Sequence, residues 1–480
     1  EYKWNIEAMY PDEEDWNKDC IKAEELGKAF TSYSDRLSQN PQVLLEAFQA
    51  RDELWLIVEK AYVYARMKKD EDTRVSKYQA MSDKAQVLIS KIAAQTSFFT
   101  PELLEMQEAK LLDFVASLDG LKLYEHVIHE ILRQKAHVLS KTEENLIAQF
   151  SELTSATNNI FSMINNADIK FGTIIDEEGE EIEVTHGRYI SLMESQDRRV
   201  RKEAFERLYA AYEAQKNTLA VTYNYNTKTD VVNARIRKYK SSLESALSGD
   251  NIPEEVYDNL IRVVNERLPS IHRYMEIRRR ALNLDQIHMY DLYTPLVDSP
   301  MGKVEYHKAL KIVEEGLQPL GEDYIYNMKS GLAQGWIDVY ENEGKTSGAY
   351  SFGSYDSKPY ILLNYNGRLK DVFTIAHEMG HSMHSYYTRK NQPFVYGGHS
   401  IFTAEVASTV NENLLMHYLI QKEVDHTRRK YLLNLYIEDF RATLFRQTMF
   451  AEFERSTHQA VEEGEVLTAE WLCDYYLELN

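Results

Sequence analysis

Apolar residues recur along most of the chain at the three- and four-residue spacing of amphipathic helices. The spacing predicts helices over residues 41–94, 101–116 and 142–164, and again, with breaks, from about 197 to 315. Only 19 glycines and 10 prolines interrupt the 480 residues, so we expect a mainly α protein. The apolar positions that define the first of these stretches are Leu44, Leu45, Phe48, Leu54, Ile57, Val58, Ala61 and Ala65.

Two regions depart from the helical spacing. Residues 169–186 (IKFGTIIDEEGEEIEVTH) alternate apolar and polar positions around Glu178 and Gly179, which predicts a β-hairpin. Further on, the runs 336–340 and 360–365 are rich in β-forming residues and enclose glycine-rich turns. We therefore expect one small sheet just before the helical stretch that carries the chemical motif described next.

The stretch TIAHEMGHSMHSYY (residues 374–387) holds three histidines and one glutamate. His377 and His381 stand four apart in an H-E-x-x-H pattern, so on a helix both imidazoles face the same side and can bind one metal ion. Glu378 can then take a proton from a metal-bound water. Taken alone, the pattern also fits an ordinary helix rich in histidine. The apolar positions that would face a core are Val372, Ile375, Ala376, Met379 and Met383.

The residues that follow the motif exclude one class of zinc peptidase. A metzincin site requires glycine and histidine where this chain has His384 and Tyr387. His384 lies one helical turn past His381. We expect it either to line the cleft, where it would contact substrate, or to pack behind the site.

A catalytic zinc site needs a third protein ligand and leaves a fourth position open for water. After a break at Gly397-Gly398, the chain predicts a second helix with Thr403 as its N-cap. Glu405 and Glu412 lie seven apart on one face of that helix. We expect Glu405 to be the third ligand, with Glu412 as the alternative ligand or as a partner of another ligand.

The predicted sheet offers a place for an extended peptide, which can add a strand to an exposed sheet edge. SGAYSFG (347–353) and PYILLNY (359–365) are the two candidate edge segments. Gly348 and Ala349, in the first of them, are candidate substrate-binding residues. The alternative is a sheet that only supports the motif helix.

Charge and cysteine content narrow the class of protein. The formal net charge of -21 argues against general binding of nucleic acid or anionic membrane surfaces, because both need a basic protein surface. Cys20 and Cys473 are the two cysteines, which excludes a disulfide framework and fits a reducing compartment. No apolar run is long enough to span a membrane, and the acidic stretch EYKWNIEAMYPDEEDW is no targeting signal. We expect a cytoplasmic protein.

Several stretches together resemble one family. GKTSGAYSFG, PYILLNYNGRLKDVFTIAHEMGHSMHSYY and FTAEVASTVNE closely resemble oligoendopeptidase F, in the thimet-oligopeptidase family of zinc peptidases. The initial EYKWNIEAMYP, the 169–186 hairpin and SALSGDNIPEEVYDNLI (245–261) are also similar to that branch. The resemblance covers most of the chain, and residues 335–415 carry its most specific part.

The resemblance implies a mainly α, multi-helical metallopeptidase with two lobes, a deep substrate channel and a small β-sheet beside the zinc-binding helix. Residues 1–190 would form an N-terminal helical lobe that includes the hairpin, and residues 191–480 the catalytic region. The family's zinc ligands fall on His377, His381 and Glu405, and its catalytic glutamate on Glu378. The chain is thus expected to bind one Zn²⁺ and to hydrolyse internal bonds of short peptides.

The resemblance also implies a further C-terminal segment whose histidine and tyrosines bind substrate, whereas this chain ends at AEWLCDYYLELN. We therefore expect metal binding with poor turnover from the chain as it stands. Two alternatives remain open: a catalytically impaired helical scaffold that binds peptides, and an exopeptidase with the same zinc chemistry. The sequence predicts neither the side-chain preference nor the oligomeric state.

Overall fold

The structure, a computed structural model, describes residues 2–297 and 302–480. The chain divides into two compact units, each built from two separate segments. Unit 1 consists of Glu1–Lys135 and Met301–Glu423, and unit 2 of Ala136–Pro300 and Val424–Asn480. Each unit therefore brings together segments far apart in the sequence.

The expected division into 1–190 and 191–480 follows the chain without interruption, and residue 190 lies inside unit 2. A single boundary along the chain cannot describe compact units that are each made of two separate segments.

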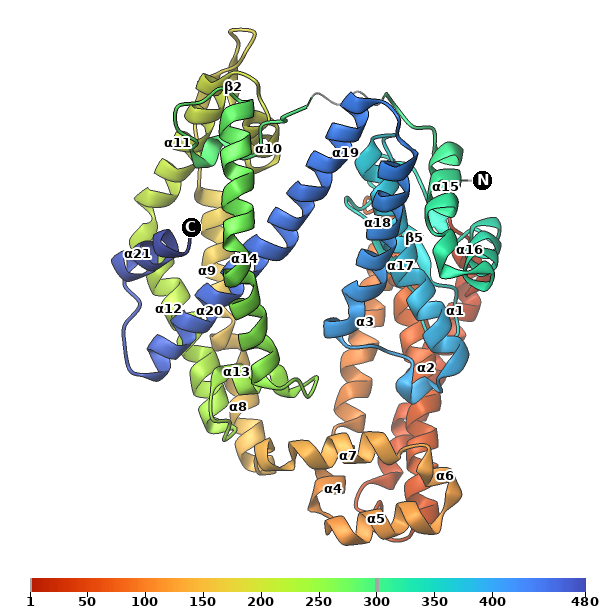
Figure 1. The fold of residues 1–480 in the computed structure, drawn as a ribbon. Coiled ribbons are helices and arrows are strands. Elements are labelled where there is room, and N and C mark those ends of the chain that lie inside the picture. Colours follow the sequence, from red (N-terminus) through yellow and green to blue (C-terminus); the bar gives the residue numbers. More distant parts are fainter. Residues whose placement is uncertain (1, 298–301) are drawn as a thin grey trace. The chain divides into compact units, whose positions relative to one another are not determined.

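Unit 1 is mainly helical, and α1, α2 and α3 pack against one another (Figure 1). A buried hydrogen bond from Trp16 Nε1 to the carbonyl of Ala61, 2.9 Å long, joins α1 to α2. The helices of unit 1 are α1 (Glu13–Phe30), α2 (Pro41–Glu71), α3 (Ser76–Thr96), α4 (Phe99–Glu105), α5 (Glu108–Ser117), α6 (Asp119–Lys122), α7 (Glu125–Arg133), α15 (Tyr306–Gly316), α16 (Glu322–Ala333), α17 (Leu369–Asn391) and α18 (Ile401–Lys422), with 3-10 turns η1 (Ile6–Ala8), η2 (Thr31–Tyr33), η6 (Gln318–Leu320) and η7 (Phe394–Tyr396).

Helix α2 starts where the sequence predicts. Pro41 occupies its first turn, and the Asn40 side chain accepts a hydrogen bond from the N–H of Val43 at 3.0 Å. All eight apolar positions expected from the spacing in this stretch are buried. The helical pattern and its core face are therefore confirmed here.

Three predicted helices are each interrupted once. The stretch 41–94 forms α2 and α3, which are separated by residues 72–75. The stretch 101–116 forms α4 and α5, because Met106 adopts an extended backbone while its side chain stays buried. The stretch 142–164 likewise forms α8 and α9, which meet at Ser155. The apolar residues on either side of these short breaks still recur at helical spacing, so periodicity alone does not reveal the breaks.

The small sheet of unit 1 consists of β3 (Ile337–Asp338), β4 (Tyr350–Phe352) and β5 (Tyr360–Leu362). Its order is β3-β5-β4, with β5 parallel to β3 and antiparallel to β4. Helix α17 contacts β4 and β5, so the expected sheet beside the motif helix is confirmed.

The two candidate edge segments differ in their place in this sheet. PYILLNY contains β5, the central strand, whose residues are all buried, so its prediction as an edge is wrong. An apolar run paired on both sides presents no free edge. SGAYSFG contains β4, which pairs on one side only in the described sheet.

Unit 2 contains the predicted β-hairpin, which is confirmed. Strand β1 (Thr173–Ile175) pairs antiparallel with β2 (Glu181–Glu183), and Gly179 in the connecting turn has a φ of +87°. Ile174 is buried in a cluster with apolar residues of α10 and α11. The hairpin therefore has one packed face.

The remaining elements of unit 2 are helical, as expected for a mainly α protein. Among the helices that the structure describes, none is long and apolar enough to cross a bilayer. These elements are α8 (Lys141–Thr154), α9 (Ala156–Met163), α10 (His186–Met193), α11 (Arg198–Ala214), α12 (Lys216–Ile236), α13 (Ser242–Ser248), α14 (Glu254–Ala281), α19 (His426–Asp439), α20 (Arg446–Glu462) and α21 (Ala469–Leu479), with π-helical segments η4 (Ile164–Asp168) and η8 (Phe440–Phe445) and 3-10 turns η3 (Gln134–His137) and η5 (Met289–Asp291).

Candidate metal centre

Helix α17 carries the H-E-x-x-H motif and is fixed at its start and along one face. The Asp371 carboxylate accepts hydrogen bonds from the N–H groups of Asn366 and Arg368, both 2.9 Å long, which caps the helix. All five apolar positions predicted to face a core are buried. The packed face determines the direction in which His377 and His381 point.

Three potential ligand atoms converge between α17 and α18. The Nε2 atoms of His377 and His381 lie 3.2 Å apart. Glu405 Oε2 lies 3.4 Å from the first and 3.5 Å from the second. Among the residues that the structure describes, this is the single group of three or more such side chains able to hold a metal ion.

Glu405 reaches this point from a second helix, α18. Helix α18 begins at Ile401, so Thr403 lies inside the helix and its prediction as the N-cap is wrong. Ser400, not Thr403, has the extended backbone of a cap residue. The Ser408 hydroxyl donates a 2.6 Å hydrogen bond to Glu405 Oε2, which limits the rotation of that carboxylate.

Glu412 lies outside the group of three, on the other side of the first histidine. Its Oε2 is 3.4 Å from Nδ1 of His377. The hydrogen bond with Glu412 raises the pKa of His377 above its ordinary value, against the opposing effect of burial. A carboxylate in this position orients a ligating imidazole and selects the tautomer with a free Nε2. Glu412 thus lies beside His377 and outside the group of three, and its role as a partner of a ligand stays a prediction.

Glu378 lies buried beside the cluster, with a relative exposure of 7 %. Burial raises the pKa of its carboxyl group to about 7, and the neighbouring Glu405 and Glu412 add to the increase. His377 and the N–H of Ser351, in β4, act in the opposite direction. A carboxyl group with a pKa near neutrality can both accept and release a proton.

Two residues that support the cluster were not predicted from the sequence. A Cβ atom on Gly380 would lie 2.6 Å from Ser408 Cα and 2.7 Å from the carbonyl oxygen of Ala407, so only glycine permits this approach of α17 and α18. Asn411 of α18 donates a 2.9 Å hydrogen bond to the carbonyl of Ala376. A glycine inside a predicted helix was the one available signal, because it marks a close backbone approach.

The predicted substrate-binding residues lie outside the group of three. His384 stacks on His399, with ring centroids 4.1 Å apart, and its buried Nδ1 has no hydrogen-bond partner. Gly348 is exposed and has a φ of +86°, while Ala349 immediately precedes β4. Gly348 and Ala349 thus lie next to β4, and the substrate contacts of all three residues stay predictions.

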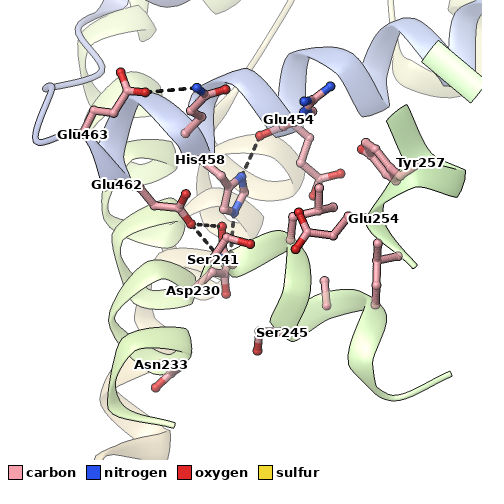
Figure 2. Close-up of a pocket in the computed structure, with 16 residues that line it drawn as sticks. Asp230, Asn233, Ser241, Ser245, Glu254, Tyr257, Glu454, His458, Glu462 and Glu463 are labelled. Carbon is pink, nitrogen blue, oxygen red and sulfur yellow. Dashed lines mark hydrogen bonds and ion pairs between the residues drawn. The ribbon is translucent and has the colours of Figure 1, made fainter. Parts of the chain in front are cut away.

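A second group of histidine and carboxylates lines a cavity of about 750 Å³ in unit 2 (Figure 2). His458 Nδ1 donates to the Glu454 carbonyl at 2.7 Å, and its Nε2 lies 3.3 Å from Asp230 Oδ2. Glu462 accepts hydrogen bonds from the N–H and the hydroxyl of Ser242, both 2.6 Å long. These polar groups are thus paired with protein partners.

A helical protein with two histidines and one glutamate converging on an H-E-x-x-H helix has the features of a metallopeptidase. Comparison with known families identifies which one. Residues 191–480 match the description "Peptidase family M3", and residues 102–171 match "Oligopeptidase F". The chain belongs to peptidase family M3 and is a hydrolase of the metallopeptidase class, as the resemblance implied.

Similar proteins cover nearly the whole chain. Oligopeptidase PepF of Bacillus subtilis is 47% identical over 99% of this chain and 71% of its own length. Group B oligopeptidase PepB of Streptococcus agalactiae is 44% identical over 100% of this chain and 80% of its own. A peptidase structure from Chlamydophila abortus has a TM-score of 0.91 at 35% identity, covering 99% of this chain and 80% of that one. The mainly α fold class is therefore confirmed.

Proposed function

We propose that this chain is a zinc-dependent endopeptidase that hydrolyses internal bonds of short oligopeptides. In this proposal His377, His381 and Glu405 bind one zinc ion, and Glu378 is the general base. The observation that carries the proposal is the convergence of three ligand atoms, all within 4.8 Å of one another, beside a buried carboxyl group.

The donor set fits zinc in chemistry and spacing. Two imidazole nitrogens and one carboxylate oxygen form a common ligand set for catalytic zinc, which keeps one position open. Ligand atoms of a tetrahedral zinc ion lie about 3.3–3.6 Å apart, given zinc–ligand distances of about 2.0–2.2 Å. The separations of 3.2, 3.4 and 3.5 Å agree with that geometry.

A bound zinc ion supplies Lewis acidity, which polarises the scissile carbonyl and acidifies water. The proton transfers of the proposed reaction are carried out by Glu378. Glu378 accepts a proton from the attacking water as its oxygen bonds to the carbonyl carbon. The same carboxyl group delivers that proton to the leaving amine as the C–N bond breaks. Burial raises the pKa of this carboxyl group, which increases its affinity for that proton.

The proposed substrates are peptides, in keeping with the names of the relatives, which are oligopeptidases and oligoendopeptidases. We propose that an extended peptide runs along β4 near Gly348 and Ala349, and that His384 contacts it. We further propose a cytoplasmic location, because Cys20 and Cys473 are both free thiols. Fractionation of the source cells followed by immunoblotting tests that location.

The proposed function is tested with Glu378→Gln, which keeps the size and polarity of the side chain but removes the base. We expect the variant to retain zinc and to lose about 10²–10⁴-fold in kcat. Mass spectrometry of the products from an internally labelled peptide separates internal cleavage from trimming at chain ends. Near-parent cleavage by the variant would falsify the assignment of the base, and terminal products alone would contradict the endopeptidase proposal.

A further inference from the structure

Two serine hydroxyls join the motif helix to the small sheet of unit 1. Ser382, on α17, is fully buried, and its Oγ lies 2.8 Å from Oγ of Ser351, in β4. We call this contact the serine pair. Ser382 follows Glu378 by four residues on α17, so the two side chains lie on the same face of the helix. The serine pair is therefore one helical turn from the carboxyl group proposed as the general base.

The backbone of β4 at Ser351 points away from the neighbouring strand β5. Ile361, which pairs with Ser351 in the sheet, donates its N–H to the carbonyl of Trp336, beside β3, at 2.8 Å. Opposite residues of an antiparallel pair either exchange both hydrogen bonds or neither, so the N–H of Ser351 faces the other edge of β4. It donates there to the carboxyl group of Glu378. One residue of β4 thus contacts α17 through both its side chain and its backbone.

The opposite face of β4 is fixed to α2. Side chains of successive strand residues point to opposite faces. The Tyr350 hydroxyl donates a 2.8 Å hydrogen bond to the buried Asp70, which also accepts one of 3.0 Å from the Thr346 hydroxyl. This anchor alone would still permit a small rotation of the strand about the tyrosine. The serine pair supplies the second anchor, on the side that contacts Glu378.

We propose that Ser351 and Ser382 are positioning residues, whose hydroxyl contact holds β4 against α17 so that the Ser351 N–H keeps the Glu378 carboxylate in its reactive orientation. This inference rests on the proposed function, in which Glu378 is the general base. A displacement of about 1 Å at a reacting group can cost about 100-fold in rate. Loss of one hydroxyl permits a smaller shift, so we expect an effect of about tenfold.

The test compares alanine variants of the two serines. Ser351→Ala and Ser382→Ala each remove the serine pair, so each should lower kcat about tenfold while KM and zinc content stay at the parent values. The double variant should be no slower than either single variant, because the same contact is already lost. Ser351→Thr keeps the hydroxyl group and should restore kcat close to the parent value. Steady-state kinetics on one quenched fluorescent peptide gives kcat and KM, and elemental analysis gives zinc.

Ser354→Ala is the matched control. Ser354 is also fully buried, but its hydroxyl donates a 3.0 Å hydrogen bond to Asp356, outside the contact with α17. Each alanine variant loses one hydroxyl hydrogen bond, so we expect a similar small fall in Tm in all three. The control should keep the kcat of the parent, which separates positioning of the base from a general loss of stability.

Three results would overturn the inference. Ser351→Ala and Ser382→Ala could have the same kcat as the control. Their effects could multiply in the double variant, which would mean that the two hydroxyls act separately. The fall in kcat could also occur only together with loss of zinc, which would assign the serine pair to support of the metal ligands. A parent that neither binds zinc nor cleaves peptide would instead contradict the proposed function itself.

Discussion

The candidate metal centre and the unit 2 cavity both bring histidine and carboxylate groups together on helices. They differ in whether the nitrogen and oxygen lone pairs of these groups have hydrogen-bond donors as partners. Between α17 and α18, two Nε2 atoms and one carboxylate oxygen point at the same spot. In the unit 2 cavity, His458 is instead held by the Glu454 carbonyl and by Asp230 (Figure 2). The first arrangement leaves acceptors facing one another, and the second pairs each group with a protein donor or acceptor.

The difference separates the candidate metal centre from a group whose polar atoms are all paired within the protein. Two imidazole lone pairs 3.2 Å apart repel each other unless a proton or a metal ion lies between them. The surrounding residues maintain this arrangement, with Glu412 behind one histidine and Ser408 on the glutamate. Both ring nitrogens of His458 already have protein partners. We therefore expect that group to stabilise unit 2 and not to bind metal.

The largest expected effect comes from removing one carboxylate at each place. Glu405→Ala deletes a proposed ligand, so we expect zinc to be absent after dialysis and peptide cleavage to fall below detection. Glu462→Ala, the matched change in unit 2, should retain zinc and lose about 1–3 kcal/mol of stability, because the buried Ser242 donors lose their acceptor. Elemental analysis and thermal unfolding distinguish the two, and equal zinc loss in both variants would contradict the comparison.

The second effect tests how closely the motif helix must approach α18. Gly380→Ala places a methyl group against the backbone of Ala407 and Ser408, so we expect destabilisation of up to about 3 kcal/mol, together with weaker zinc binding. Gly398→Ala is the control, since no atom lies within 4 Å of the added Cβ. Urea unfolding gives the free energy of unfolding of each variant. The packing argument is wrong if the two alanine variants are equally stable.

The third effect is on zinc affinity and concerns Glu412, which lies beside the proposed ligand His377. Glu412→Gln retains a hydrogen-bond acceptor for His377 but removes the charge, so zinc affinity should fall about 10- to 100-fold. Asp230→Asn makes the same change beside His458 and should leave zinc affinity unaltered. Competition with a chromophoric chelator gives both affinities. An unchanged affinity in Glu412→Gln would remove Glu412 from the metal centre.

The smallest effect is the pH dependence of the unit 2 cluster. Burial lowers the pKa of His458, but its hydrogen bonds to Asp230 and to the Glu454 carbonyl outweigh burial and raise it overall. A raised folded-state pKa stabilises below the unfolded pKa of about 6.5 and is lost as pH rises through the folded value. We expect Asp230→Asn to cost roughly 0.5 kcal/mol at pH 5.5 and almost nothing at pH 9. A cost that grows with pH would contradict this sign.

The spacing of residues within one helix was enough to predict that His377 and His381 lie close together. His377 and His381 are four residues apart on one helix, and α-helical geometry alone brings them together. The burial of Met379 and Met383 followed from the same spacing. Helical spacing alone does not select Glu405 as the proposed third ligand, because that residue lies on another helix. Whether Glu405 or Glu412 reaches the histidines depends on how that helix packs.

Tertiary packing decided what the sequence could not predict. Whether Glu412 faces Nδ1 of His377 depends on the register between α17 and α18, and that register depends on Gly380. The central position of β5 likewise depends on a parallel partner, β3, that precedes it by more than twenty residues. Such contacts join distant segments and leave no periodic signal in either one.

The most direct measurement is the zinc content of the purified protein, determined by elemental analysis beside His381→Ala. We predict about one zinc ion per chain in the parent, as expected for a single His-His-Glu site, and essentially none in the variant. A parent free of zinc after purification with the metal supplied, or a variant that retains the same amount, would contradict a zinc centre at α17 and α18.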